Sequence, residues 1–195
     1  MTTYYVSNSG SNTNAGTGTG DASAWRTVLY ACTRPHLEPG DTIKILPGIY
    51  QEANIKLTAS NTVSGTSENP ITLTANDTAD KPIIRNTNGP TVKARQLWTQ
   101  NVSWWVFDNL EFSDFNGIGV EIEATSQTVE GMTVRDCDFI RGNVDNPISG
   151  HTLHFTSKYG YAQTRAIADS NYFYNCVPRW NYDRQGGNDK FIRVD

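Results

Sequence analysis

The apolar residues of this 195-residue chain stand mainly in short runs in which they alternate with polar residues. Such alternation is typical of β-strands with one buried face, and the runs end at Gly, Pro, Asn or Asp, the usual residues of turns. In the first half of the chain, the pattern predicts strands within residues 42–46, 53–57, 70–74, 82–85 and 92–94. We therefore expect an all-β protein.

The stretch EPGDTIKILPGIYQE, residues 38–52, indicates how the strands are connected. Ile43 and Ile45 occupy alternate positions of one strand, Pro47-Gly48 interrupts it, and the pair Ile49-Tyr50 resumes at once. A Pro-Gly pair predicts a sharp turn. We interpret it as a corner at which the chain leaves one sheet and enters the next.

The second half contains an internal repeat. The segments VFDNLEFSDF (106–115), TVRDCDFIRG (133–142) and IADSNYFYNC (167–176) align with Phe112, Phe139 and Phe173 in register, at steps of 27 (139 − 112) and 34 (173 − 139) residues. Each is followed by a second short strand, at 120–123, 152–156 and 191–195. Recurring pairs of strands predict a solenoid in which each turn covers the apolar face of the one before it.

One segment has a helical pattern instead. In DASAWRTVLYACT, the residues Trp25, Val28, Leu29 and Cys32 follow the spacing of one helix face. We predict a helix over 22–33, with Asp21 or Ser23 as its N-cap residue. Its expected role is to cap the apolar end of the first turn of the solenoid.

Composition excludes several partners. The net charge of −4 provides no basic surface for nucleic acid. No run of 18 apolar residues predicts a membrane span, and the start MTTYYVSNSG lacks the features of a signal peptide. The odd number of cysteines, three without C-x-x-C spacing, indicates neither a disulfide framework nor a zinc site.

The N-terminal motifs resemble a known superfamily. The series YYVSNSGSNTNAG, AWRTVLYAC, PGDTIKILPGIYQE and ENPITLTA, which covers about the first 75 residues, is similar to the opening of right-handed parallel β-helix proteins of the pectate-lyase-like superfamily. The resemblance implies a single parallel β-helix domain over 1–195, the N-terminal part of a longer helix. It also implies a secreted, carbohydrate-active protein.

The C-terminal segment resembles a narrower group. ADSNYFYNCVPRWNYDRQGGNDKFIRVD, residues 168–195, is similar to chondroitinase-B-like and alginate-lyase-like polysaccharide lyases. This implies β-elimination on an acidic polysaccharide. Asn188 and Lys190 stand where those lyases carry glutamates that bind calcium, so we expect no cofactor, with Lys190 supplying positive charge instead.

The strand pattern places candidate site residues on one face. If Val120, Ile122, Leu153, Phe155, Ile192 and Val194 point inward, their neighbours Glu121, His154 and Arg193 form a row on the outer face. We predict His154, Lys190 and Arg193 as catalytic residues and Glu121 as a substrate-binding residue. The alternative is a solvated surface on which His154 simply pairs with Glu121.

A loop beyond this row offers further contacts. In VPRWNYDRQGGND, Trp180 and Tyr182 have flat apolar faces for sugar rings, and Arg179 and Arg184 could bind carboxylates bidentately. The alternative is an ordered loop that packs its aromatic rings on the solenoid.

Three classes of function remain open at this stage: a polysaccharide lyase, a non-catalytic glycan-binding or phage-adhesin module, and a purely structural solenoid. We also expect an uncapped C-terminal end, which includes Phe173 and Ile192, to be mobile after about Pro178 or to mediate self-association.

Overall fold

The computed structural model describes residues 1–33, 37–86, 94–115, 117–140, 151–157, 163–164, 167–169 and 172–174. These ranges contain 17 β-strands and one short α-helix, and every strand pair within them is parallel. The expected all-β class is thus confirmed. No helix in this part of the chain is long and apolar enough to cross a membrane.

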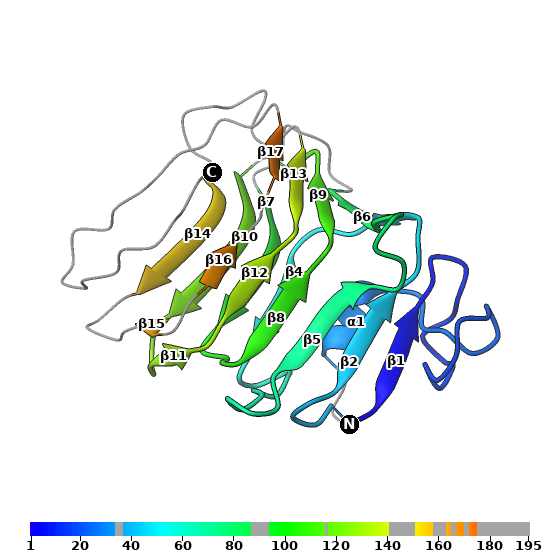
Figure 1. Cartoon of the computed structure of the whole chain (residues 1–195), viewed down its shortest axis with the longest axis horizontal. Coiled ribbons are helices and arrows are strands. Elements are labelled where there is room, and N and C mark those ends of the chain that lie inside the picture. Colours follow the sequence, from blue (N-terminus) through cyan, green and yellow to red (C-terminus); the bar gives the residue numbers. More distant parts are fainter. Residues whose placement is uncertain are drawn as a thin grey trace.

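The strands form three main sheets, which we call A, B and C (Figure 1). Sheet A contains, in spatial order, β1 (Thr3–Val6), β2 (Thr42–Ile45), β5 (Ile71–Ala75), β8 (Trp105–Asp108), β12 (Thr133–Arg135) and β16 (Ile167–Asp169). Sheet B contains β3 (Ile49–Gln51), β6 (Ile83–Arg85), β9 (Glu111–Ser113), β13 (Asp138–Ile140) and β17 (Tyr172–Tyr174). Sheet C contains β4 (Ile55–Thr58), β7 (Ala94–Gln100), β10 (Gly117–Ala124) and β14 (His151–Ser157). A small fourth sheet pairs β11 (Val129–Glu130) with β15 (Gln163–Thr164).

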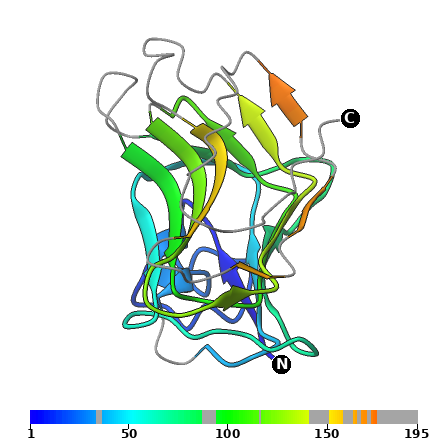
Figure 2. The ribbon, with the colours of Figure 1, turned by 90° about the vertical axis from the view of Figure 1, so that its left-hand side faces the viewer.

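The chain passes from sheet A to sheet B to sheet C and then returns to sheet A, and we call one such passage a circuit. Figure 2 shows the strands of the three sheets as walls around one interior. The repeat seen in the sequence is the repeat of these circuits, because Phe139 pairs with both Phe112 and Phe173 in sheet B. The predicted alignment of the three segments is therefore confirmed.

The interior is apolar because successive circuits place apolar side chains over one another. In sheet A, Ile43, Leu73, Phe107 and Val134 are in register and fully buried. In sheet B, the rings of Phe112 and Phe139 stack with centroids 5.4 Å apart. Each such side chain contributes roughly 1.5–3 kcal/mol through its burial, so the stack of circuits supplies the core.

The corner at Pro47-Gly48 lies where the sequence predicts it. β2 ends at Ile45 in sheet A and β3 begins at Ile49 in sheet B. Gly48 has φ +140, and a Cβ there would lie 2.7 Å from the Asn8 side chain, so only glycine fits. The Tyr50 hydroxyl lies 2.8 Å from the Leu46 carbonyl oxygen, to which it donates, and ties the corner down.

Other corners use residues with positive φ. Asn109 and Asp136 occupy equivalent positions between sheets A and B in consecutive circuits, with φ values of 55° and 50°. Asn and Asp tolerate this conformation better than other non-glycine residues. Trp104 also has a positive φ, 59°, although it is neither Asn nor Asp. Its ring lies where a Cβ on Gly131 of the next circuit would stand. Gly131 thus gives the Trp104 ring its place.

The predicted helix is wrong in its extent. Helix α1 runs only over Val28–Cys32, and its N-cap residue is Thr27, not Asp21 or Ser23. Trp25 lies before the helix in a parallel bridge to Val6, because its backbone pairs with the outer edge of β1. Trp25, Val28 and Cys32 are buried as expected, whereas Leu29 is 37% exposed.

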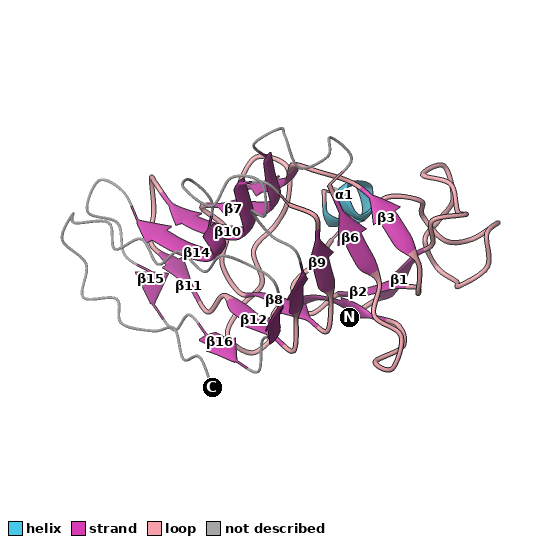
Figure 3. Ribbon diagram, turned by 90° about the horizontal axis from the view of Figure 1, so that it is seen from above, coloured by secondary structure: helices cyan, strands magenta, loops and turns pink. Residues whose placement is uncertain are grey.

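Helix α1 lies at the N-terminal end of the stack (Figure 3). It contacts β1, β2 and β4 there. The preceding Gly/Ser/Asn-rich segment is ordered there. The Tyr5 backbone N–H donates a hydrogen bond to the Gly16 carbonyl oxygen, and the Trp25 indole donates one to the Asn14 carbonyl oxygen at 2.8 Å. The helix and this segment together cover the first circuit, as the predicted capping role requires.

Candidate functional site

Four strands of sheet C align one side chain each on the outer face, away from the core. The register pairs Lys56 of β4 with Trp98 of β7, Trp98 with Glu121 of β10, and Glu121 with His154 of β14. We call these four residues the outer row. Their inward neighbours Leu97, Val120, Ile122 and Leu153 are buried in the core, which matches the predicted register.

Glu121 and His154 contact each other in this row. His154 Nδ1 lies 3.2 Å from Glu121 Oε1. The side chain of Glu121 is 4% exposed and that of His154 is 15% exposed, so the carboxylate is covered while the imidazole stays partly accessible. The second carboxylate oxygen, Oε2, forms an ion pair with Arg95 Nε, which leaves Glu121 bound on both sides.

Two cationic side chains, Lys56 and Arg95, lie against the ring of Trp98. The Lys56 Nζ atom lies 4.2 Å from the Trp98 ring centroid and the Arg95 Cζ atom lies 4.1 Å from it. Both distances are within the range of cation–π attraction. Arg95 therefore touches both Trp98 and Glu121, and it connects the two central residues of the outer row.

A second carboxylate lies two residues further along β10, on the same face. Glu123 Oε2 accepts hydrogen bonds from Trp98 Nε1 at 3.2 Å and from Gln100 Nε2 at 2.8 Å. Glu123 is 1% exposed, although it also faces away from the core. Both carboxylates of this face are thus held by neighbouring side chains and present almost no surface to solvent.

This arrangement favours proton transfer at His154. With the proton on Nδ1, the imidazole donates to Glu121 and Nε2 keeps its lone pair. A carboxylate that binds one ring nitrogen fixes the orientation and the tautomer of a histidine base. Glu121 can fill this role through Oε1, because Arg95 pairs with the other oxygen, Oε2.

The structure does not test the remaining predicted site residues. Arg179, Trp180, Tyr182, Arg184, Lys190 and Arg193 lie outside the described residues, as do Asn188 and Lys158. Of His151, only its place in β14, in register with Ile118, is described. The roles of all these residues stay predictions.

Three residues of the site were missed from the sequence: Lys56, Arg95 and Trp98. Of the predicted strand 92–94, only Ala94 lies within the described residues, and it begins β7, which runs on to Gln100. In ARQLWTQ only Leu97 is a clear apolar inward residue, since the inward position 99 is a threonine. Alignment of this segment with GIGVEIEA would have revealed the strand and the position of Trp98 beside Glu121.

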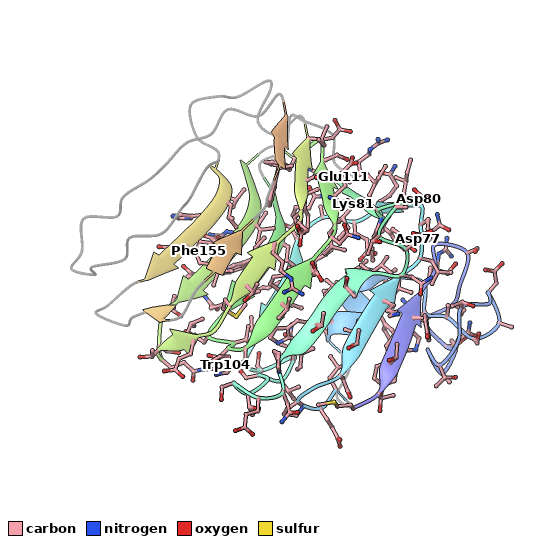
Figure 4. All side chains as sticks on the ribbon, viewed as in Figure 1. Asp77, Asp80, Lys81, Trp104, Glu111 and Phe155 are labelled. Carbon is pink, nitrogen blue, oxygen red and sulfur yellow. The ribbon has the colours of Figure 1, made fainter. Side chains whose placement is uncertain are left out.

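Other ionisable groups of the described chain have structural contacts. Figure 4 shows Asp77, Asp80, Lys81 and Glu111 gathered near β6 and β9, far from Phe155 on β14. Lys81 Nζ forms an ion pair with Asp138 at 2.9 Å and donates to the Asp136 carbonyl oxygen. Half-exposed pairs of this kind contribute about 0–1 kcal/mol.

Metal and thiol chemistry find no support in the described ranges. No group of three or more His, Cys, Asp or Glu side chains there could hold a metal ion. Cys137 is buried, and its burial raises the pKa of its thiol to about 12, so it is not a nucleophile. Cys32 is buried too, and burial raises its pKa as well.

Comparisons with known proteins agree with the fold. No family model and no curated protein matches the chain. Two solved structures of a GH136 lacto-N-biosidase from Eubacterium ramulus are similar to it. The selenomethionine derivative has a TM-score of 0.70 and 21% identity over 89% of this chain, and the native protein has a TM-score of 0.61 and 18% identity over 88%.

The chain spans about a third of the length of those two proteins, 34% and 36%. A rhamnogalacturonan lyase matches with a TM-score of 0.40 and 18% identity over 90% of this chain and 54% of its own. The chain thus shares its β-rich fold with part of the lacto-N-biosidase. Membership of the pectate-lyase-like superfamily stays a resemblance.

Proposed function

We propose that the circuits form a right-handed parallel β-helix. The regular order of sheets A, B and C and the parallel pairing of every described strand support this. Crossover connections between parallel strands are right-handed in nearly all proteins, because strand twist favours that hand. The fold likeness to the lacto-N-biosidase agrees with it.

We further propose that the protein is a secreted, carbohydrate-active enzyme that cleaves an acidic polysaccharide by β-elimination, with His154 as the base. The observation that carries this proposal is the contact between His154 Nδ1 and Glu121 Oε1 at 3.2 Å. Nε2 takes the proton from the carbon next to the uronate carboxyl group. The electron pair forms a carbon–carbon double bond, the bond to the glycosidic oxygen breaks, and that oxygen receives a proton from a water molecule.

Elimination is favoured over hydrolysis by the state of the two carboxylates. A glycoside hydrolase needs one carboxyl group as acid and a second carboxylate as base or nucleophile, both in contact with the sugar. Glu121 and Glu123 are 3% and 1% exposed, and neighbouring side chains bind both. His154, Arg95 and Lys56 remain accessible, and they suit a negatively charged ligand.

The residues outside the described ranges complete the proposal. We assign Lys190 and Arg193 the task of neutralising the uronate carboxyl group, which stabilises the charge that develops on it. Arg179 and Arg184 would bind neighbouring carboxylates, and Trp180 and Tyr182 would stack on sugar rings. In this proposal Lys190 replaces calcium, because a lysine at that position repels the ion.

Incubation with polygalacturonate, alginate and chondroitin tests the reaction. We expect one of them to yield an unsaturated uronate, followed by its ultraviolet absorbance. His154→Asn keeps a polar side chain without a base and should lower the rate by roughly 10²–10⁴-fold. Lys44→Gln, on the outer face of sheet A, is the control and should leave the rate unchanged. Full activity of H154N would refute the role of His154.

A non-catalytic glycan-binding module is the second candidate. It is favoured by the ion pair between Arg95 and Glu121, because a guanidinium already paired with a carboxylate neutralises a substrate less effectively. This candidate predicts binding of an acidic polysaccharide without an unsaturated product.

A further inference from the structure

Trp98, in the outer row, contacts three charged side chains. Lys56 Nζ and Arg95 Cζ both lie within 4.2 Å of its ring centroid, and its Nε1 donates to Glu123 at 3.2 Å. These partners come from three adjacent strands, β4, β7 and β10. Such convergence of two cations and one carboxylate on one indole is more than a surface tryptophan needs for packing.

We propose that Trp98 is a positioning residue that holds Lys56 and Arg95 together as an anion-binding subsite beside His154, and that the face selects its glycan by charge. The inference rests on the proposed acidic ligand, but not on its cleavage. It assigns Trp98 a role other than sugar stacking.

Of the two cations beside Trp98, Arg95 has a carboxylate partner and Lys56 has none among the described residues. Glu121 forms its ion pair with Arg95, and Glu123 accepts hydrogen bonds from the neutral donors Trp98 and Gln100. Lys56 is exposed and has no ion pair among the residues that the structure describes. An anionic group of a ligand is the partner that this ammonium lacks.

Trp98 can keep the two cations in place against their mutual repulsion. The negative face of an indole attracts an ammonium and a guanidinium, and an indole attracts them more strongly than the ring of a phenylalanine or tyrosine. The hydrogen bond from Nε1 to the Glu123 carboxylate polarises the indole and makes its ring more electron-rich. Fixing Lys56 in advance lowers the entropy that the flexible side chain loses when a ligand binds.

The same contacts oppose stacking of a sugar on this ring. A pyranose that stacks on tryptophan needs an uncovered ring face at van der Waals distance, where Lys56 and Arg95 now stand. A neutral glycan would have to displace at least one cation and would gain no charge contact in return. We therefore expect the face to discriminate against neutral polysaccharides.

The row also has a defined length. Lys56 and His154 are separated by three strand spacings of about 4.8 Å each. The subsite around Lys56 therefore binds a group on a sugar other than the one that meets His154. Trp98 should influence affinity for long chains more than the chemical step itself.

Binding experiments on the full chain test this inference with polygalacturonate, sulfated dextran and neutral dextran as probes. We expect the chain to bind the two polyanions, with affinity that falls as salt rises, and not to bind neutral dextran. Trp98→Leu and Lys56→Gln should each weaken polyanion binding by roughly ten-fold, whereas Trp98→Phe should lose less and Lys56→Arg should restore binding. Lys44→Gln serves as the matched control on another sheet.

A double-mutant cycle separates positioning from a general effect on the fold. If Trp98 acts through Lys56, W98L should weaken binding less in the K56Q background than in the wild type. Equal losses in both backgrounds, or binding of neutral dextran as tight as that of polygalacturonate, would overturn the proposal, and so would failure to bind either polyanion. Charge-selective binding without cleavage would refute the proposed elimination and still support the role of Trp98.

Discussion

At the scale of single residues, Glu121 combines two properties that rarely occur together. It faces away from the core, yet its side chain is 4% exposed and touches Arg95 on one side and His154 on the other. A nearly buried carboxylate is costly to keep charged unless ion pairs or hydrogen bonds satisfy it. The contacts of Glu121 are therefore needed for its own stability as well as for the orientation of His154.

Replacement of this carboxylate tests the coupling. Glu121→Gln should lower the free energy of unfolding by about 1–3 kcal/mol, because Arg95 loses its ionic partner and a charge-assisted hydrogen bond is lost. Urea denaturation measures the change. Glu68→Gln, at an exposed position, is the control and should stay within about 0.5 kcal/mol of the wild type. An unchanged stability of E121Q would mean that the ion pair contributes nothing to the fold.

At the scale of elements, the helix that caps the first circuit depends on the side chain of Glu52, which follows β3. Helix α1 is too short to stabilise itself, and the carboxylate of Glu52 accepts the amides of Val28 at 2.7 Å and Leu29 at 2.9 Å. Burial raises the pKa of Glu52, while these two amides oppose the rise. Glu52 thus joins α1 to the segment that follows β3.

This contact predicts a pH-dependent stability. A carboxyl group with a raised pKa in the folded state contributes stability that is present below its unfolded pKa and is lost as pH rises through the folded value. The wild type should therefore lose some stability as pH rises from about 4.5. Glu52→Gln should remove this slope, and it should cost about 0.5–2 kcal/mol at neutral pH through the weaker cap. Urea denaturation over a pH series measures both the pH dependence and the loss of stability at neutral pH. If E52Q kept the same pH dependence as the wild type, another titrating group would be its cause.

Most elements could be predicted from local pattern, and the exceptions have physical reasons. Strands such as β2 and β5 alternate cleanly, and the corner at Pro47-Gly48 needs glycine. The helix was predicted too long because Trp25 has helical spacing but pairs with β1, a tertiary contact that no local pattern reveals. Of the site, the pair of Glu121 and His154 followed from the repeat. Arg95 and Trp98 did not, because β7 carries a threonine at an inward position. Lys56 lies in a predicted strand, but its place in the site depends on its register with Trp98 of β7.

At the scale of the whole molecule, stability comes from contacts between consecutive circuits. The backbone bonds of each described strand go to the strands of neighbouring circuits, and the rings of Phe112 and Phe139 stack between two of them. A cavity in this stack would weaken the contact of one circuit with its neighbours on both sides.

Truncation of Phe139 measures how much the stacking of its ring on Phe112 contributes to stability. Phe139→Ala should lower the free energy of unfolding by about 3–5 kcal/mol, and Phe139→Leu by less, because leucine fills part of the space. Urea denaturation followed by tryptophan fluorescence reports the change, with Lys44→Gln as the surface control. A loss below about 1 kcal/mol in F139A would show that the neighbouring rings collapse into the space and that the stack is not tightly packed.

The spacing of the outer row is set by backbone hydrogen bonds between β4, β7, β10 and β14, whatever side chains the row carries. A substitution at Lys56, Trp98, Glu121 or His154 changes the chemistry at one step of a fixed pitch and leaves the other steps in place. The backbone of sheet C thus fixes the distances along the outer row, and the side chains determine its chemistry. An added or removed circuit would change the number of side chains in the row without altering the distance between them.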